Sequence, residues 1–350
     1  MTRPKVRPVV WKPPPVPARS RRSTGPRPLP PLRVMELGGT GPEDVALDAD
    51  GRVVTGLADG RLLRLSPDGR QVDTIASTGG RPLGVELLDD GRLLVCDARR
   101  GLLRVDPATG EVELLVEEAG GQRLVFCNNA AVAPDGTVYF SDSSRRFGID
   151  HWKAELLEHS GTGRLLRREP SGTVEVVLDG LQFANGVALA PDGSYVVVAE
   201  TGAYRLTRLW LTGSRAGQTD LLADNLPGFP DNVSTGSDGL VWVALPSPRD
   251  LVVDRLHQMP PVLRSAVWAL PGRLQPAPQT TVWALAFDGT GQIVHDLQGP
   301  SRRFRMVTGV RERAGQLFLG SLVDDAVAVL NVPEDLRGTV PDTAGGGPGV

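Results

Sequence analysis

Short apolar runs separated by turn-forming residues recur along most of the chain. Five of these runs follow an Asp-Gly pair, and they read RVVTG, RLLVC, TVYFS, SYVVV and LVWVA; the pairs begin at Asp50, Asp90, Asp135, Asp192 and Asp238. Asp-Gly between two apolar runs favours a β-hairpin, and we expect a type I′ turn, in which both central residues take positive φ. The pattern therefore indicates a repeated unit of antiparallel strands.

A second hairpin follows in three of the units. GRLLRLSPDG begins at Gly60, GLLRVDPATG at Gly101 and GRLLRREPSG at Gly163, and each leads into a further apolar run. Four antiparallel strands per unit are typical of a β-propeller blade. A sixth unit without the aspartate covers Arg303 to Asn331. We therefore predict an all-β fold, a six-bladed β-propeller over residues 36–333, with short helical inserts where residues 251–274 show helical periodicity within the fifth blade.

The two ends of the chain differ in composition from the repeats. Residues 1–35 contain nine basic residues, no acidic residue and many prolines, which predicts an extended, polyproline-like arm. We expect the arm to be solvated and to pack loosely on the propeller; a tether to an anionic partner is the alternative. No apolar run there is long enough for a signal peptide or a membrane span, so we expect a cytoplasmic protein. Residues 334–350 are expected to form a flexible tail.

Overall charge and cysteine content exclude several classes of function. The formal net charge of the 350 residues is -3, which gives no argument for nucleic acid or an anionic membrane surface as the main partner. The two cysteines, Cys96 and Cys127, are too few for a disulfide framework and lack the CxxC spacing of zinc sites. We expect free thiols. The sequence does not indicate an oligomeric state.

One position of the repeat carries oxygen-bearing side chains. Seven residues before the turn aspartates stand Glu43, Asn128, Asn185 and Asp231, whereas the second unit has Leu83. Equivalent positions on the innermost strands of a propeller face a common point on the central axis. Two carboxylates and two amides are hard oxygen donors that suit Ca²⁺, and the absence of His and Cys argues against zinc.

The residues next to this position are also polar. Asp44, Asn129 and Asn232 could orient the proposed ligands through hydrogen bonds. Asn, Asp and Gly are, however, common at the starts of strands, where they shape loops. On spacing alone, a calcium ring and ordinary loop chemistry both remain open.

Four segments in order resemble a known family. GPEDVALDADG, FCNNAAVAPDGTVYFSDSS, FANGVALAPDGSYVVVAET and GFPDNVSTGSDGLVWVAL are similar to the strictosidine synthase-like branch of the gluconolactonase/paraoxonase superfamily. The resemblance covers about residues 42–332 and implies a six-bladed propeller with Ca²⁺ in its channel. It implies the same four ligands, Glu43, Asn128, Asn185 and Asp231.

The resemblance also implies a choice of chemistry. Members hydrolyse lactones, aryl esters or organophosphates, whereas the plant synthases condense an amine with an aldehyde using a glutamate and no metal. Thr308 occupies that glutamate position, and because a hydroxyl cannot replace a carboxylate as base, we do not expect condensation. We expect a calcium-dependent hydrolase of a small ester or lactone, with Asp231 as the candidate catalytic base or nucleophile.

Substrate contacts are expected from the long third blade. Its insert, SSRRFGIDHWKAELLEHSG, offers Phe147, His151 and Trp152 to an apolar pocket, although a surface helix is the alternative. The histidine pair of the paraoxonases is not evident, since the four histidines, His151, His159, His257 and His295, are scattered over inserts and an outer strand. A non-catalytic propeller that uses calcium as a structural plug and serves as a binding module is the alternative function.

Overall fold

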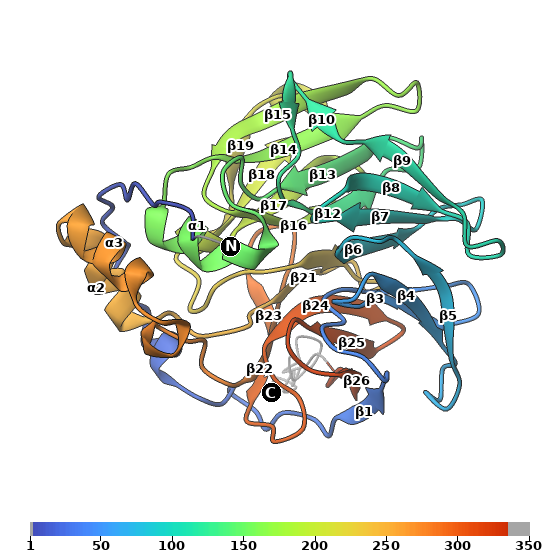
Figure 1. Ribbon diagram of the computed structural model, residues 1–350. Helices are drawn as coiled ribbons and strands as arrows, with labels where there is room; N and C mark the ends of the chain where they lie inside the picture. Colours follow the sequence, from blue (N-terminus) through green and yellow to red (C-terminus); the bar gives the residue numbers. More distant parts are fainter. Residues whose placement is uncertain (1–2, 335–350) are drawn as a thin grey trace, which may run out of the picture.

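The computed structural model describes residues 3–334, so the predicted tail lies outside the described residues from residue 335 onward. Six four-stranded antiparallel sheets surround a central axis, and a small two-stranded sheet, β10 with β11, lies at their periphery (Figure 1). The prediction of an all-β, six-bladed propeller is confirmed.

In each blade the strands run from the innermost outward in chain order. The first blade contains β2 (Val45–Leu47), β3 (Val53–Gly56), β4 (Arg61–Leu65) and β5 (Val72–Ser77); the second contains β6 (Pro82–Leu87), β7 (Leu93–Asp97), β8 (Gly101–Val105) and β9 (Val112–Val116); the third contains β12 (Cys127–Val132), β13 (Val138–Asp142), β14 (Gly163–Arg168) and β15 (Val174–Leu181). The hairpin of β10 (Glu118–Ala119) and β11 (Gln122–Arg123) stands between the second and third blades.

The remaining blades follow the same order, with one exception at the closure. The fourth blade contains β16 (Ala184–Leu189), β17 (Tyr195–Glu200), β18 (Arg205–Trp210) and β19 (Thr219–Ala223); the fifth contains β20 (Val233–Thr235), β21 (Val241–Ala244), β22 (Val282–Phe287) and β23 (Ile293–Gly299); the sixth contains β24 (Val307–Arg313), β25 (Gln316–Ser321), β26 (Ala326–Asn331) and β1 (Arg33–Glu36). The N-terminal β1 thus supplies the outer strand of the last blade, and the boundary predicted between arm and propeller at residue 35 falls inside this strand.

Helices occur in two inserts; the one within the fifth blade is predicted by the sequence, and a helix in the third blade is one of its two alternatives. α1 (Trp152–Glu158) lies between β13 and β14, and α2 (Leu251–Gln258) and α3 (Pro261–Ala269) lie between β21 and β22. Short 3₁₀ turns accompany them and the loops: η1 (Ala18–Arg21), η2 (Ile149–His151), η3 (Thr201–Ala203), η4 (Gly213–Arg215) and η5 (Gly272–Leu274). No helix within residues 3–334 is long and apolar enough to cross a membrane.

The Asp-Gly hairpins form, but with a different turn from the one expected. In the first blade Gly51 N donates to Asp48 O, Asp48 N donates to Arg52 O, and Gly51 has a φ of 75°. Asp50 is not among the described non-glycine residues with positive φ. This geometry is a type I turn closed by a left-handed glycine, so the type I′ expectation is wrong, and the turn needs glycine at one position only.

The apolar residues of neighbouring blades pack against one another. One cluster joins Ala46, Val54 and Leu62 of the first blade to Val85 and Val95 of the second, all of them buried. Burial on both faces explains why the strands read as nearly continuous apolar runs. The core is therefore a set of inter-blade layers, and polar side chains gather at the inner ends of the blades.

The N-terminal arm is docked rather than loosely packed. Val9 N donates to Glu158 O, and Trp11 N donates to His257 O. Further along, Arg19 forms a bidentate ion pair with Asp296 on β23. An extended arm has no partner for its own backbone groups, and here the helical inserts and the fifth blade provide those partners. The expectation of a loosely packed leader is wrong.

Candidate metal centre

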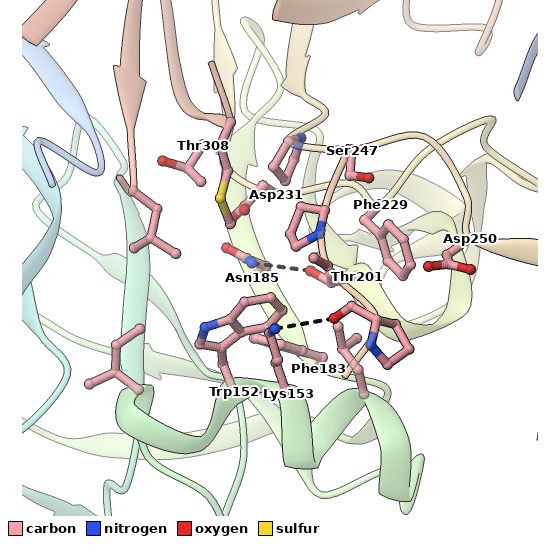
Figure 2. Close-up of a pocket in the computed structure, with 18 of the residues that line it drawn as sticks. Trp152, Lys153, Phe183, Asn185, Thr201, Phe229, Asp231, Ser247, Asp250 and Thr308 are labelled. Atoms are coloured by element: carbon pink, nitrogen blue, oxygen red, sulfur yellow. Dashed lines mark hydrogen bonds between the residues drawn. The ribbon is translucent and has the colours of Figure 1, made fainter. Parts of the chain in front are cut away.

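The four predicted ligands line one cavity at the inner ends of the blades. Glu43 precedes β2, Asn128 lies in β12, Asn185 lies in β16 and Asp231 precedes β20, and all four border a cavity of about 110 Å³. The two remaining blades contribute Leu83 and Thr308 to the same cavity. Figure 2 shows Asn185 and Asp231 beside each other, with Thr308 on the adjoining strand. The register of the repeat thus brings these side chains to one site.

β-bulges direct the two asparagines inward. In the third blade the pairing moves from Cys127 with Asp142 to Ala130 with Phe140, which leaves Asn128 in the bulged stretch. The fourth blade has the same register shift between Ala184 and Val187, around Asn185. A bulge adds a residue opposite a regular strand and re-aims a side chain. At the bulges the side chains no longer alternate regularly between the two faces of the sheet, so both asparagines can face the central axis.

Hydrogen bonds fix which end of each amide faces the cavity. Asn128 Nδ2 donates to Ser143 Oγ over 2.9 Å, and Asn185 Nδ2 donates to Thr201 Oγ1 over 3.1 Å. The oxygens Asn128 Oδ1, Asn185 Oδ1 and Glu43 Oε2 are buried and have no hydrogen-bond donor within residues 3–334. Buried oxygens without a donor are costly unless another group satisfies them. This donor set fits a hard, oxygen-seeking cation such as Ca²⁺.

The electrostatics of the two carboxylates agree with that donor set. Burial raises the pKa of Glu43 well above its usual value, and the neighbouring Asp231 raises it further. Burial likewise raises the pKa of Asp231 to about 7, although its interaction with the Asn185 side chain opposes the shift. Both carboxylates therefore need a positive partner in order to ionise together. Within residues 3–334 no three His, Cys, Asp or Glu side chains cluster as a metal site would require, so the amide oxygens are essential to this assignment.

The residues that follow the ring position alternate between polar side chains and glycine. Around the axis the order is Asp44, Gly84, Asn129, Gly186, Asn232 and Gly309. A Cβ on Gly186 would lie 2.1 Å from Val233 N, and those on Gly84 and Gly309 would approach the Cα atoms of Asn129 and Asp44 to 2.7 and 2.8 Å. Each glycine thus lets its blade approach the backbone of the next polar residue.

The three polar residues that follow the ring position, Asp44, Asn129 and Asn232, have two different roles. Asn232 Nδ2 donates to Glu43 Oε1 over 2.9 Å, so it orients a proposed ligand directly. Asn129 instead joins blades: its Nδ2 donates to Asp44 Oδ2, and its Oδ1 accepts from Val187 N. Asp44 also accepts from Val85 N. Asp44 and Asn129 therefore hold the inner strands together, and neither makes a hydrogen bond to a predicted ligand within the described residues.

Of the three predicted substrate contacts, only Trp152 lines the cavity. Phe147 is fully buried beneath α1 and packs against Ala154, Leu157 and Trp268. His151 faces the ring of Trp268 edge-on, with the ring centroids 6.0 Å apart. A sequence cannot show which side of a single helical turn meets the cavity, and this side decides which aromatic residues are available.

The wall of the cavity away from the oxygens is apolar and is assembled from the segments that lead into the inner strands and from both helical inserts. Phe126, Phe183, Phe229 and Met306 line it together with Trp152. Lys153 Nζ donates to Pro276 O over 3.1 Å and so links α1 to the loop after α3 (Figure 2). Burial lowers the pKa of Lys153. The site is therefore a ring of oxygens at one end of a mostly apolar pocket.

Two of the histidines that the sequence analysis treated as scattered lie together. The rings of His159 and His257 are 5.1 Å apart at their centroids, and the ring of Trp11 stacks on His159 at 4.0 Å. Neither histidine lines the cavity. Burial, followed by the charge of Arg264, lowers the pKa of His159 to about 3. The pair therefore belongs to the contact between arm and inserts, and no sequence motif marks it.

Comparison with known proteins places the chain in a family. The model of the SMP-30/Gluconolactonase/LRE-like region matches residues 57–259, and that of the strictosidine synthase-like N-terminal domain matches residues 29–65. The adipocyte plasma membrane-associated protein of Danio rerio is 35% identical over 83% of this chain and 75% of its own length. The Arabidopsis thaliana protein strictosidine synthase-like 10 is 35% identical over 84% of this chain and 86% of its own length. The Salmo salar homologue of the first protein is 39% identical, and the match spans 58% of its length.

Solved structures share the fold at lower identity. A gluconolactonase from Xanthomonas campestris aligns with a TM-score of 0.61 at 20% identity, covering 89% of this chain and 99% of that one. The calcium-binding protein regucalcin from Agrobacterium tumefaciens aligns with a TM-score of 0.58 at 15% identity, covering 86% and 91%. These likenesses concern the propeller alone. By its sequence matches, the chain belongs to the SMP-30/gluconolactonase/LRE-like family and carries a strictosidine synthase-like N-terminal segment.

Proposed function

We propose that the protein is a calcium-dependent hydrolase of the lactonase or arylesterase type. The observation that carries this proposal is the set of inward oxygens from Glu43, Asn128, Asn185 and Asp231 at the base of an apolar pocket. Ca²⁺ bound by them would polarise the substrate carbonyl and stabilise the developing oxyanion. The gluconolactonase family supports a hydrolytic reaction of this kind.

The residues of the pocket have different roles in the proposed reaction. Asp231, whose carboxylate borders the cavity, is the candidate to accept the proton of an attacking water. Asn232 holds Glu43 in place, and the hydroxyls of Ser143 and Thr201 hold the amides with their oxygens free. Thr308 Oγ1 donates to Glu43 O over 2.8 Å and offers no carboxylate for a condensation reaction.

The polarity of the pocket selects the class of substrate. Its walls, with Trp152, Phe183 and Phe229, offer aromatic surface, and most of the exposed lining is apolar, although Lys153, Ser247, Asp250 and Gln275 also border the cavity. Burying a hydroxyl without a partner costs about 1–3 kcal/mol in proteins. We therefore propose an apolar aryl ester or an alkyl-substituted lactone as substrate, in preference to a polyhydroxylated one.

A panel of substrates tests this function. Purified protein is assayed with phenyl acetate, an alkyl lactone, gluconolactone and a phosphotriester, with and without a calcium chelator. We expect hydrolysis of the apolar ester or lactone that chelation abolishes and added Ca²⁺ restores. Asp231→Asn should lose this activity, whereas Asp192→Asn, at an exposed hairpin turn, should keep it. Full turnover by Asp231→Asn would refute the catalytic role of Asp231.

A second function is favoured by one observation. No histidine lines the cavity, and the two buried histidines of the described chain serve the arm contact. A propeller in which calcium is a structural plug, and which serves as a binding module, has no need of a histidine base. Loss of folding on chelation, without hydrolysis of any panel member in either state, would support that alternative.

A further inference from the structure

The helix α3 has its polarity reversed relative to an ordinary surface helix. Its buried residues are Arg264 and Trp268. Its exposed positions are Val262, Leu263, Ala266, Ala269 and the adjoining Leu270. Val262 is 67% exposed and Leu263 37% exposed. A helix packed on a protein core normally buries the apolar face and exposes the polar one, so this face lacks the partner that its composition calls for.

The buried arginine explains why the helix stays in this orientation. Arg264 donates to Leu157 O, to Val9 O and toward His257 Nδ1, at distances of 3.0, 2.6 and 2.9 Å. These bonds tie α3 to α1, to the arm and to α2. The helix is thus fixed with its apolar face outward, and Figure 1 shows α2 and α3 projecting from the side of the propeller. The apolar face continues at Leu274, which is 61% exposed.

A row of cations borders this face. The arm runs along α3, where Trp268 Nε1 donates to Pro4 O and Arg3 Nη1 donates to Trp268 O. Its residues alternate, so that Val6 packs against the core beside Trp268 while Arg3, Lys5 and Arg7 are exposed. Arg255 and Arg273 of the insert are exposed as well.

Acidic residues are rare in the described segments that form this surface, and on the adjoining segments Asp250 caps α2 while Asp150 pairs with Arg99. Residues 3–35 contain no acid, and the only acid of residues 251–274 is Asp254. Asp254 is buried and paired with Arg249. The small net charge of the whole chain therefore conceals a local surface that is both apolar and cationic.

From this charge pattern we propose that the exposed face of α3 and the adjoining arm dock onto an anionic lipid surface. An apolar helical face bordered by Lys and Arg is the composition of a helix that lies in a membrane interface. A second copy of the chain is a poorer occupant, because pairing this face with itself would bring two rows of cations together. The inference is independent of the proposed hydrolysis, since it concerns the outer side of the insert.

Vesicle sedimentation tests the proposal with the full-length protein. Vesicles of phosphatidylcholine mixed with phosphatidylserine are compared with vesicles of phosphatidylcholine alone. We expect binding to the anionic vesicles only, weakened at high salt. Val262→Asp should weaken it by about tenfold or more, since on docking it replaces a buried apolar contact with a charged side chain. Lys5→Ala should weaken it roughly fivefold.

A matched control separates docking from general exposure of apolar groups. Ile293, on β23, is 51% exposed, and Ile293→Asp should bind vesicles as the parent protein does. Circular dichroism and thermal unfolding should be unchanged in all three variants. Failure to bind anionic vesicles, equal binding to neutral ones, or unaltered binding by Val262→Asp would overturn the proposal. So would concentration-dependent dimers in sedimentation velocity that Val262→Asp abolishes, because they would assign the face to a second copy.

Discussion

Asn232 Nδ2 donates a hydrogen bond to Glu43 Oε1 over 2.9 Å, so the fifth blade holds a carboxylate of the first blade in place. The other oxygen of that carboxylate, Oε2, has no donor within the described residues. This contact makes Asn232 a positioning residue for the proposed calcium site, and it separates Asn232 from Asn129, which occupies the equivalent position in the third blade.

The two asparagines should respond differently to truncation. Asn232→Ala removes the group that orients Glu43, and loss of such a partner typically lowers metal affinity about 10–100-fold. Asn129→Ala breaks contacts between blades and should lower stability by about 1–3 kcal/mol while leaving the calcium affinity of the folded protein near the parent value. Calorimetric titration with Ca²⁺ and denaturant unfolding measure the two quantities. Equal calcium affinities of the two variants would contradict this division of roles.

The glycines that alternate with Asp44, Asn129 and Asn232 around the axis predict a steric effect. A Cβ at Gly186 would lie 2.1 Å from Val233 N, so Gly186→Ala must push the fourth and fifth blades apart at their inner ends. We expect a loss of unfolding free energy of about 3 kcal/mol or more. Gly272→Ala is the control, because nothing lies within 4 Å of its Cβ position. Thermal unfolding of both variants provides the measurement, and similar melting temperatures would contradict the close approach.

Trp152 and Phe147 are expected to separate substrate binding from stability. Trp152→Ala removes a wall of the pocket and should raise KM for an aryl ester, and because Trp152 is half-buried against Phe126 and Phe183 it should cost about 2 kcal/mol of unfolding free energy. Phe147→Ala leaves a cavity in the core beneath α1 and should cost about 3–5 kcal/mol. Its folded fraction should keep the parent KM. Steady-state kinetics with denaturant unfolding test both expectations, and a raised KM in Phe147→Ala alone would reverse the assignment.

The buried histidine pair predicts a loss of stability in acid. The pKa of His159 and that of His257 are each lowered to about 3, chiefly by burial. The unfolded chain takes up these protons below about pH 6.5, whereas the folded chain does not until near pH 3, so stability falls as the pH drops through this window. Each histidine contributes about 1.4 kcal/mol for each pH unit.

His159→Asn should make this dependence shallower. His159 has a φ of 56°, a left-handed conformation that asparagine adopts readily. The variant removes one titrating group without adding backbone strain. Unfolding free energies measured from neutral to acidic pH check the slope, and a slope equal to that of the parent protein would contradict the role of this histidine.

Docking of the arm predicts a stability effect far from the cavity. Trp11 stacks on His159 at a centroid distance of 4.0 Å and lies edge-on to His257 at 5.3 Å. Because Trp11 is half-buried, Trp11→Ala should lower the unfolding free energy by about 2 kcal/mol. Val10 is 60% exposed, and Val10→Ala should change it by less than about 0.5 kcal/mol. Limited proteolysis should cleave the arm faster in the tryptophan variant only.

The sequence by itself determined the blades and the register of the candidate site. Alternation, turn glycines and spacing are local properties, and a repeat multiplies their signal, so Glu43 and Asp231 could be assigned to one ring although 188 positions separate them. The alternating glycines, Gly84, Gly186 and Gly309, were also readable at the position after the ring, but their meaning depends on contacts between blades.

Only the tertiary structure decided which groups meet across blades and inserts. The choice of Trp152 over Phe147, the pairing of His159 with His257 and the closure of the last blade by β1 each join segments with no shared local pattern. The docked arm is a further case, because a proline-rich segment favours an extended chain equally well in solvent and against a surface. Local sequence fixes backbone preference and periodicity, whereas the partner of a side chain is set by the packing of distant segments, which a single sequence does not encode in any short pattern.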